Sequence, residues 1–185
     1  MKNLVALVAA AGLSAGFSAV GNAQSAPVAS DPLLHTQTSF DFEVQLPYGE
    51  AAPLFGPEGE RAWAGKPWDP KFIYPQPATD SEGAVFTVRH GAYDAVWVNT
   101  LFDAASKHYQ YVYFLPGLMV TMIDVRFKPA GADSTAVNVV YARTAIAPEG
   151  NEHVKAMTEG DKAAGKDWQQ AIDAYLAKTR TPAHP

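Results

Sequence analysis

The stretch STAVNVVYARTAIAPEGNEHVKAMTEGDKAAGKDWQQAIDAY, residues 134–175, joins a strand pattern directly to a helix pattern. In its first part Val137, Val139 and Tyr141 alternate with smaller or polar residues, and this period of two predicts a half-buried strand. From Asn151 onward the apolar residues recur at helical spacing along one stripe. Asn151 is a residue type that favours the N-cap position, so we expect a long amphipathic helix to begin there.

Strand patterns also dominate the chain upstream of this stretch. A cleanly alternating first strand is followed by Pro47 and by a Gly- and Pro-containing segment that allows only short helices. Short turn-type segments separate the later strands, and consecutive strands with short links predict an antiparallel meander. The expected strands are 39–46, 71–74, 84–90, 95–102, 107–114, 118–128 and 134–146, with short helices near 48–54 and 58–64.

Composition and charge exclude several function classes. The chain has 185 residues, 48% of them apolar, a formal net charge of −5 and no cysteine. Its length fits one domain, and the absence of cysteine excludes disulfides, thiolate metal sites and cysteine nucleophiles. No basic patch indicates a nucleic-acid partner. No spacing typical of metal ligands or of a cofactor motif is present, so we expect no metal and no cofactor.

The first residues have the layout of a secretory signal peptide. A short basic start is followed by an uncharged apolar stretch, and small residues precede a cleavage site after Ala23. The alternative, a membrane anchor, is disfavoured because the apolar stretch is short and contains Gly and Ser. We therefore expect a signal peptide over 1–23, a flexible lead-in over 24–35, a folded domain over 36–179 and a tail over 180–185. The mature protein is expected to be periplasmic or secreted, monomeric and without stable membrane insertion.

Several short motifs resemble the SRPBCC superfamily, which includes START-like lipid-transfer domains and polyketide cyclase/dehydrase-like proteins. These motifs are GAVFT (83–87), VWVNT (96–100), YVYFLPG (111–117), IDV (123–125) and YARTA (141–145), the last leading to PEGN (148–151). The resemblance covers about residues 36–179 and is strongest to small bacterial exported members. It implies an α+β helix-grip fold. In this fold a curved antiparallel sheet of about six to seven strands wraps around a long C-terminal helix, and two short helices follow the first strand.

The helix-grip fold usually leaves a cavity between its sheet and its last helix. Aromatic walls offer apolar area in such a cavity, and tyrosine hydroxyls can hold a polar end of the ligand. We therefore expect a small-molecule-binding protein that holds an apolar or aromatic ligand, lipid-like or polyketide-like. The expected ligand-binding residues are Phe42, Trp63, Trp68, Phe86, Val88, Tyr109, Tyr111, Thr121, Ile123, Tyr141, Met157 and Trp168. Trp63 and Trp68 form either a lid over the ligand or a plug of the core.

Two other functions remain open at this point. A cyclase, dehydratase or hydrolase would use Asp161, His90 or Tyr111 as acid–base groups in the same cavity. Asp161 falls on the apolar stripe of the last helix, where it either faces the cavity, turns to solvent or pairs with Arg143. A protein-interaction module, the second alternative, would instead expose an apolar patch on the surface.

Overall fold

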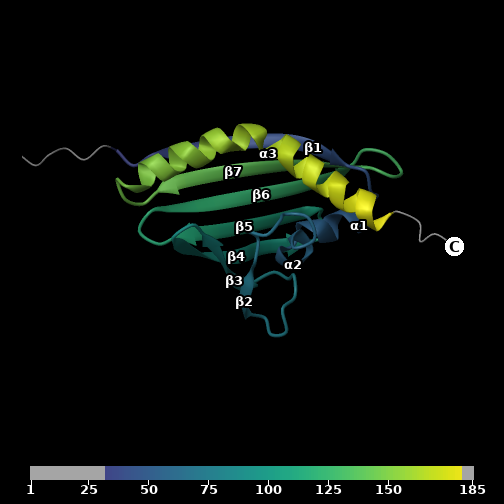
Figure 1. The fold of residues 1–185 in the computed structure, drawn as a ribbon, viewed down its shortest axis with the longest axis horizontal. Coiled ribbons are helices and arrows are strands. Elements are labelled where there is room, and N and C mark those ends of the chain that lie inside the picture. Colours follow the sequence, from purple (N-terminus) through teal and green to yellow (C-terminus); the bar gives the residue numbers. More distant parts are fainter. Residues whose placement is uncertain (1–31, 181–185) are drawn as a thin grey trace, which may run out of the picture.

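Seven strands form one antiparallel sheet in the computed structural model, which describes residues 32–180. Their spatial order is β1-β7-β6-β5-β4-β3-β2, so the chain forms a meander from β2 to β7 and the first strand closes onto the last. The sheet curves around the C-terminal helix (Figure 1). The strands are β1 His35–Val44, β2 Lys71–Tyr74, β3 Val85–His90, β4 Tyr93–Asp103, β5 His108–Leu115, β6 Met119–Pro129 and β7 Thr135–Ala145.

Three short helical turns follow β1, and one long helix ends the domain. The turns are α1 Tyr48–Ala51, the 3-10 helix η1 Ala52–Phe55 and α2 Pro57–Glu60, and the long helix is α3 Gly150–Thr179. The predicted helix-grip fold is therefore confirmed. The predicted first strand begins too late, because β1 already starts at His35, where it pairs with Thr144 of β7.

The expected N-cap of α3 is wrong. The helix begins at Gly150, and Asn151 lies inside its first turn without capping it. A Cβ on Gly150 would come within 1.9 Å of the Leu118 carbonyl oxygen, so this close approach requires glycine. The Asn151 side chain instead accepts a hydrogen bond from the Leu34 N–H at 2.8 Å and thereby ties the chain before β1 to α3.

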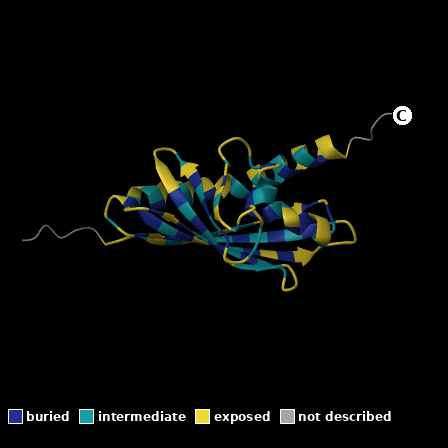
Figure 2. Ribbon diagram, turned by 90° about the horizontal axis from the view of Figure 1, so that it is seen from below, coloured by how far each residue is buried: buried dark blue, intermediate teal, exposed yellow. Residues whose placement is uncertain are grey.

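Burial follows the alternation along the strands. In β7 the residues from Thr135 to Ala145 at odd positions are buried, and their neighbours face outward. Figure 2 shows the resulting alternation of buried and less buried bands along the strands. The inward residues, together with one face of α3 and the short helices, form the hydrophobic core.

The two glycines in the middle of α3 have different surroundings. A Cβ at Gly165 would lie 3.2 Å from the Phe40 ring and 3.3 Å from the Asp41 carbonyl oxygen. A Cβ at Gly160 would meet nothing within 4 Å. Gly165 therefore allows α3 to approach β1 closely, whereas Gly160 has no contact that requires glycine. The helix bends near its middle (Figure 1).

The outer face of the sheet carries apolar side chains in register. Val98, Val112, Met122 and Ala142 lie opposite one another across β4, β5, β6 and β7. A second row joins Val96, Phe114 and Val120. We call these two sets the outer rows.

None of the helices in the described part of the chain is long and apolar enough to cross a membrane.

Candidate functional site

A cavity of about 410 Å³ is lined by three parts of the fold: the inner face of the sheet, the segment that contains α2, and the helix α3. Its volume falls within the range of about 300–1,000 Å³ that is typical of small-molecule sites. Most of the predicted ligand-binding residues line it: Trp63, Trp68, Phe86, Val88, Tyr111, Ile123, Tyr141, Met157 and Trp168. Their role in binding a ligand stays a prediction.

Three predicted ligand-binding residues lie elsewhere in the core. Phe42 packs against Phe55 and the edge of Trp168, so it supports the wall from behind. Tyr109 stacks on Phe102 with ring centroids 3.9 Å apart. Thr121 is fully buried in β6. All three side chains are buried as expected, but they are not among the residues that line the cavity.

Trp63 and Trp68 are fixed parts of the wall. The Trp63 indole donates to the Leu54 carbonyl at 2.7 Å, and the Trp68 indole donates to the Pro57 carbonyl at 2.9 Å. Trp63 also meets Trp168 of α3 edge to face. With Trp97 of β4, all four tryptophans of the chain line the cavity.

His90 and its neighbours form one part of the cavity wall. The His90 ring stacks on Tyr113 with centroids 5.5 Å apart and on Trp97 at 6.0 Å. The Tyr113 hydroxyl lies 3.3 Å from the Met157 sulfur. Burial lowers the pKa of His90, so its imidazole is neutral at pH 7. In the described part of the chain His90 Nε2 has no hydrogen-bond partner.

Asp161 does not line the cavity. It forms a buried, two-pronged ion pair with Arg143 of β7, in which Arg143 Nη2 donates to Asp161 Oδ1 at 2.9 Å. The Thr38 hydroxyl of β1 adds a third hydrogen bond at 2.5 Å. Burial alone would lower the pKa of Arg143, but its hydrogen bonds to Asp161 raise it overall. Asp161 therefore fastens α3 to two strands, and only its partner Arg143 reaches the cavity wall.

Glu60 also lines the cavity, and the sequence analysis missed it. Asp80 accepts the backbone N–H groups of Glu58 and Gly59, and this fixes α2 so that Glu60 lines the cavity. Burial and the nearby Asp80 carboxylate raise the pKa of Glu60 well above its usual range. The spacing Glu60, Trp63, Ala64 is one helical face, and this pattern could have indicated a carboxylate beside the predicted tryptophan.

Two tyrosines, Tyr111 and Tyr141, also line the cavity. Tyr111 donates its hydroxyl proton to the Phe55 carbonyl at 2.5 Å. Burial raises the pKa of Tyr111 well above its usual range, and burial also raises that of Tyr141, with the negative charge of Glu60 contributing to both. Both phenols are therefore neutral at any ordinary pH and act as hydrogen-bonding groups.

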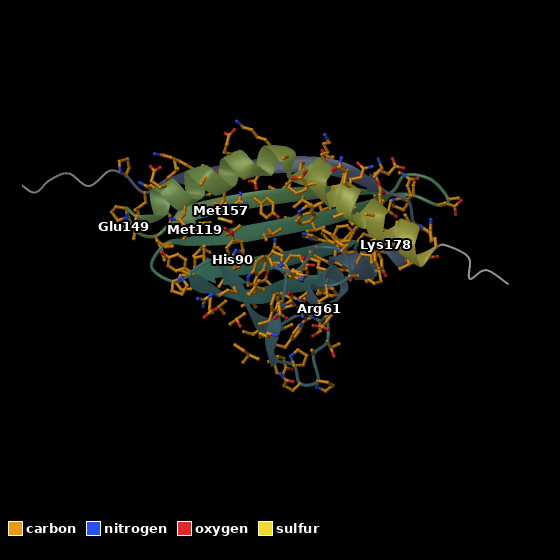
Figure 3. All side chains as sticks on the ribbon, viewed as in Figure 1. Arg61, His90, Met119, Glu149, Met157 and Lys178 are labelled. Atoms are coloured by element: carbon orange, nitrogen blue, oxygen red, sulfur yellow. The ribbon has the colours of Figure 1, made fainter. Side chains whose placement is uncertain are left out.

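The cavity combines an aromatic wall with a few titratable groups. Figure 3 labels His90 and Met157, which in this view lie nearer than Arg61 to Glu149 at the start of α3. The site can enclose an apolar or aromatic body and offers Glu60 and His90 as titratable groups in its wall. Among residues 32–180 no group of three or more His, Asp or Glu side chains is placed to hold a metal ion.

Comparison with solved structures identifies the same architecture in several proteins. Norcoclaurine synthase from Thalictrum flavum, in complex with dopamine and hydroxybenzaldehyde, superposes with a TM-score of 0.57 at 15% identity over 80% of this chain and 90% of its own. The chain has an SRPBCC-like helix-grip fold.

Two further structures agree with this assignment. The di-domain ARO/CYC protein BexL, from the BE-7585A biosynthetic pathway, gives a TM-score of 0.58 at 12% identity over 80% of this chain and 48% of its own. A hypothetical protein from Helicobacter pylori gives 0.58 at 10% identity over 76% of this chain and 87% of its own. No family profile and no curated protein matches the sequence. At these identities the likeness concerns the fold.

Proposed function

We propose that the protein is an exported carrier or receptor that binds a small apolar or aromatic molecule in the cavity between the sheet and α3. The observation that carries the proposal is the cavity itself, whose volume suits a small ligand and whose wall contains all four tryptophans. Aromatic walls favour flat or ring-containing ligands, because ring stacking adds to the gain from burying apolar area.

The structural neighbours support an aromatic ligand. The norcoclaurine synthase structure holds dopamine and hydroxybenzaldehyde, both of which carry one aromatic ring. BexL is described as an ARO/CYC protein of a biosynthetic pathway. Both proteins share the fold in which this chain places its cavity.

A thermal-shift panel of fatty acids and one- to three-ring aromatic compounds tests the proposal. A ligand that binds only the folded state raises the melting temperature, and tryptophan fluorescence reports the same event because every tryptophan lines the cavity. Native mass spectrometry of protein isolated from its own host would show which molecule it carries.

A matched pair of variants shows whether such a ligand occupies the cavity. Ala171 lines the cavity from α3, so Ala171→Trp fills it, whereas Ala174→Trp places the same side chain on the exposed side of the helix. We expect Ala171→Trp to abolish ligand-induced shifts and Ala174→Trp to retain them. Absence of any shift across the panel in the unsubstituted protein would refute the proposal.

Acid–base catalysis is the second candidate, because two titratable groups on one cavity wall have pKa values displaced in opposite directions. Burial holds Glu60 in its protonated form toward higher pH and holds His90 in its neutral form. A neutral carboxylic acid and a neutral imidazole are the acid and base that a cyclase or dehydratase requires. Mass spectrometry of bound compounds after incubation distinguishes the candidates, since a carrier returns them unchanged. If a compound is converted, His90→Gln is expected to remove the conversion.

A further inference from the structure

Glu60 places a carboxylate in the cavity wall, and a ligand held by apolar contacts alone would have no use for it. It is half-buried and lines the cavity, yet within the described residues its carboxylate has neither a hydrogen bond nor an ion pair. The two arginines of the wall are both compensated: Arg143 pairs with Asp161, and Arg89 pairs with Asp94. The cavity therefore contains a carboxylate for which residues 32–180 provide no cationic partner.

Aromatic rings surround the part of the cavity where Glu60 lies. Trp63 lies in the turn after α2, where its backbone N–H donates to the Glu60 carbonyl at 3.1 Å, and its ring contacts Trp168 with ring centroids 5.3 Å apart. Tyr111 and Tyr141 lie close enough for the Glu60 charge to raise the pKa of both phenols. Electron-rich ring faces attract a cation, and so does a carboxylate in the same space.

We propose that the cavity selects ligands that carry a basic nitrogen on an aromatic or apolar body, with the Glu60 carboxylate as the counterion of the resulting ammonium group. This inference rests on the proposed binding function and names the chemical class of its ligand. The ring system would fill the apolar part of the cavity, and the ammonium group would occupy the part beside Glu60.

The charges around the cavity agree with a cationic ligand. Asp167 of α3 lines the cavity and is itself exposed to solvent. No ion pair involving it exists among residues 32–180. An anionic ligand would meet both carboxylates, while the arginines are already neutralised. The net charge of −5 adds long-range attraction for a cation.

Binding of a cation changes the protonation of Glu60. In the empty cavity burial and Asp80 raise the pKa of Glu60, so the carboxyl group retains its proton to higher pH than usual. The ionisable groups that interact with it are Asp80 from the segment before β3, Tyr111 of β5 and Tyr141 of β7, and none of these three is cationic. An ammonium group would favour the ionised form, so the proton would leave Glu60 for solvent as the ligand binds.

Three probes of similar shape and different charge test the inference: 2-phenylethylamine, 2-phenylethanol and 3-phenylpropanoate. Titrations followed by tryptophan fluorescence are expected to show the amine binding about tenfold or more tightly than the alcohol, and the anion binding weakest. The amine affinity should rise as the pH increases above the ordinary glutamate range, because Glu60 ionises through its raised pKa while the amine stays charged. Calorimetry in buffers of different ionisation enthalpy should detect the released proton.

Two variants locate the effect at Glu60. Glu60→Gln keeps the size of the side chain and removes its charge, so it is expected to weaken amine binding about tenfold or more, to leave alcohol binding intact and to abolish proton release. Glu58→Gln on the same short helix removes a carboxylate that pairs with Arg61, and it should behave as the unsubstituted protein.

The outcomes separate this inference from the proposed function. If the alcohol or the anion binds as tightly as the amine, or if Glu60→Gln leaves amine affinity unchanged, the inference is wrong and the binding function stands. If none of the three probes binds, the inference is also wrong, and the wider thermal-shift panel then decides the binding function.

Discussion

Single side chains decide whether a charge in this core serves stability or function. Asp161 and Glu60 are both carboxylates beside the same aromatic core. The Asp161 carboxylate accepts three hydrogen bonds from Arg143 and Thr38, whereas the Glu60 carboxylate accepts none from residues 32–180. A buried charge with full compensation is typical of a structural clamp. An uncompensated carboxylate facing a cavity indicates a functional site.

Removal of Asp161 is expected to destabilise the fold strongly. Asp161→Ala leaves the Arg143 guanidinium buried without its counterion, and breaking a buried pair in this way costs about 3–5 kcal/mol. Urea unfolding measures this loss. Asp173→Ala on the exposed side of α3 is the control and should change stability by no more than about 0.5 kcal/mol. A cost for Asp161→Ala as small as the control would show that the pair does not hold α3.

Glu60 is expected to make stability depend on pH. Its pKa in the folded state lies above that in the unfolded chain, so the folded state binds the extra proton and stability falls as pH rises from the ordinary glutamate range through the raised pKa. Glu60→Gln removes this fall. The melting temperature of the variant should therefore exceed that of the unsubstituted protein by a margin that widens as the pH rises above the ordinary glutamate range.

His90 also makes stability depend on pH, and it does so equally in Glu60→Gln and in the unsubstituted protein. Its pKa is lowered in the folded state, so its effect is a loss of stability on acidification below about pH 6.5. This loss cancels in the difference between Glu60→Gln and the unsubstituted protein. A margin that stays constant with pH would contradict the burial of an ionisable Glu60.

At the scale of elements, α3 contains one glycine that the packing requires and one that it does not. Gly160→Ala adds a Cβ in open space and is expected to stabilise the protein by about 0.5–1 kcal/mol, because alanine loses less chain entropy in a helix. Gly165→Ala places a Cβ against Phe40 and Asp41 of β1 and should not stabilise the fold. Thermal unfolding of both variants measures the difference, and an equal gain at the two sites would refute the close approach of α3 to β1.

The strands and the long helix were predictable, because burial of one face makes apolar residues recur at a regular spacing in the sequence. The alternation in β7 and the stripe on α3 report directly which side chains meet the core. The start of α3 was not predictable. Gly150 is required there because its backbone lies close to the Leu118 carbonyl, and Asn151 accepts a hydrogen bond from the Leu34 N–H instead of capping the helix. Both partners are distant in sequence, so no local pattern records them.

At the scale of the whole molecule, the apolar wall of the cavity was predictable but its charged groups were not. Residues such as Tyr111 and Ile123 share the inner face through their strand period alone. Glu60 reaches the cavity only because Asp80 fixes α2 across the fold, and Asp161 leaves it only because Arg143 lies opposite. Whether a carboxylate has a cationic partner depends on tertiary contacts, so the sequence could not show which carboxylate lines the cavity and which is paired in the core.

Export of the protein is a prediction of the sequence, and it concerns residues outside the described range. We expect protein from the native host to begin near Gln24, which intact-mass measurement would show directly. Lys2 is the only charged residue of the expected leader, so the mature chain would carry a net charge of −6. Recovery of chains that retain residues 1–20 would contradict the prediction.

The outer rows are the surface on which a second copy of the chain or another protein would dock, so the oligomeric state tests whether they form an interface. Of their members only Phe114 and Met122 are more than a third exposed, at 38% and 49%, and the valines between them are half-buried by their neighbours. This exposed apolar area is small, and the negative net charge opposes self-association, so we expect a monomer in sedimentation at all accessible concentrations. A dimer that Met122→Lys disperses would instead place an interface on the outer rows and would favour the interaction-module alternative. Because Met122 faces away from the cavity, the same variant should leave ligand-induced shifts unchanged.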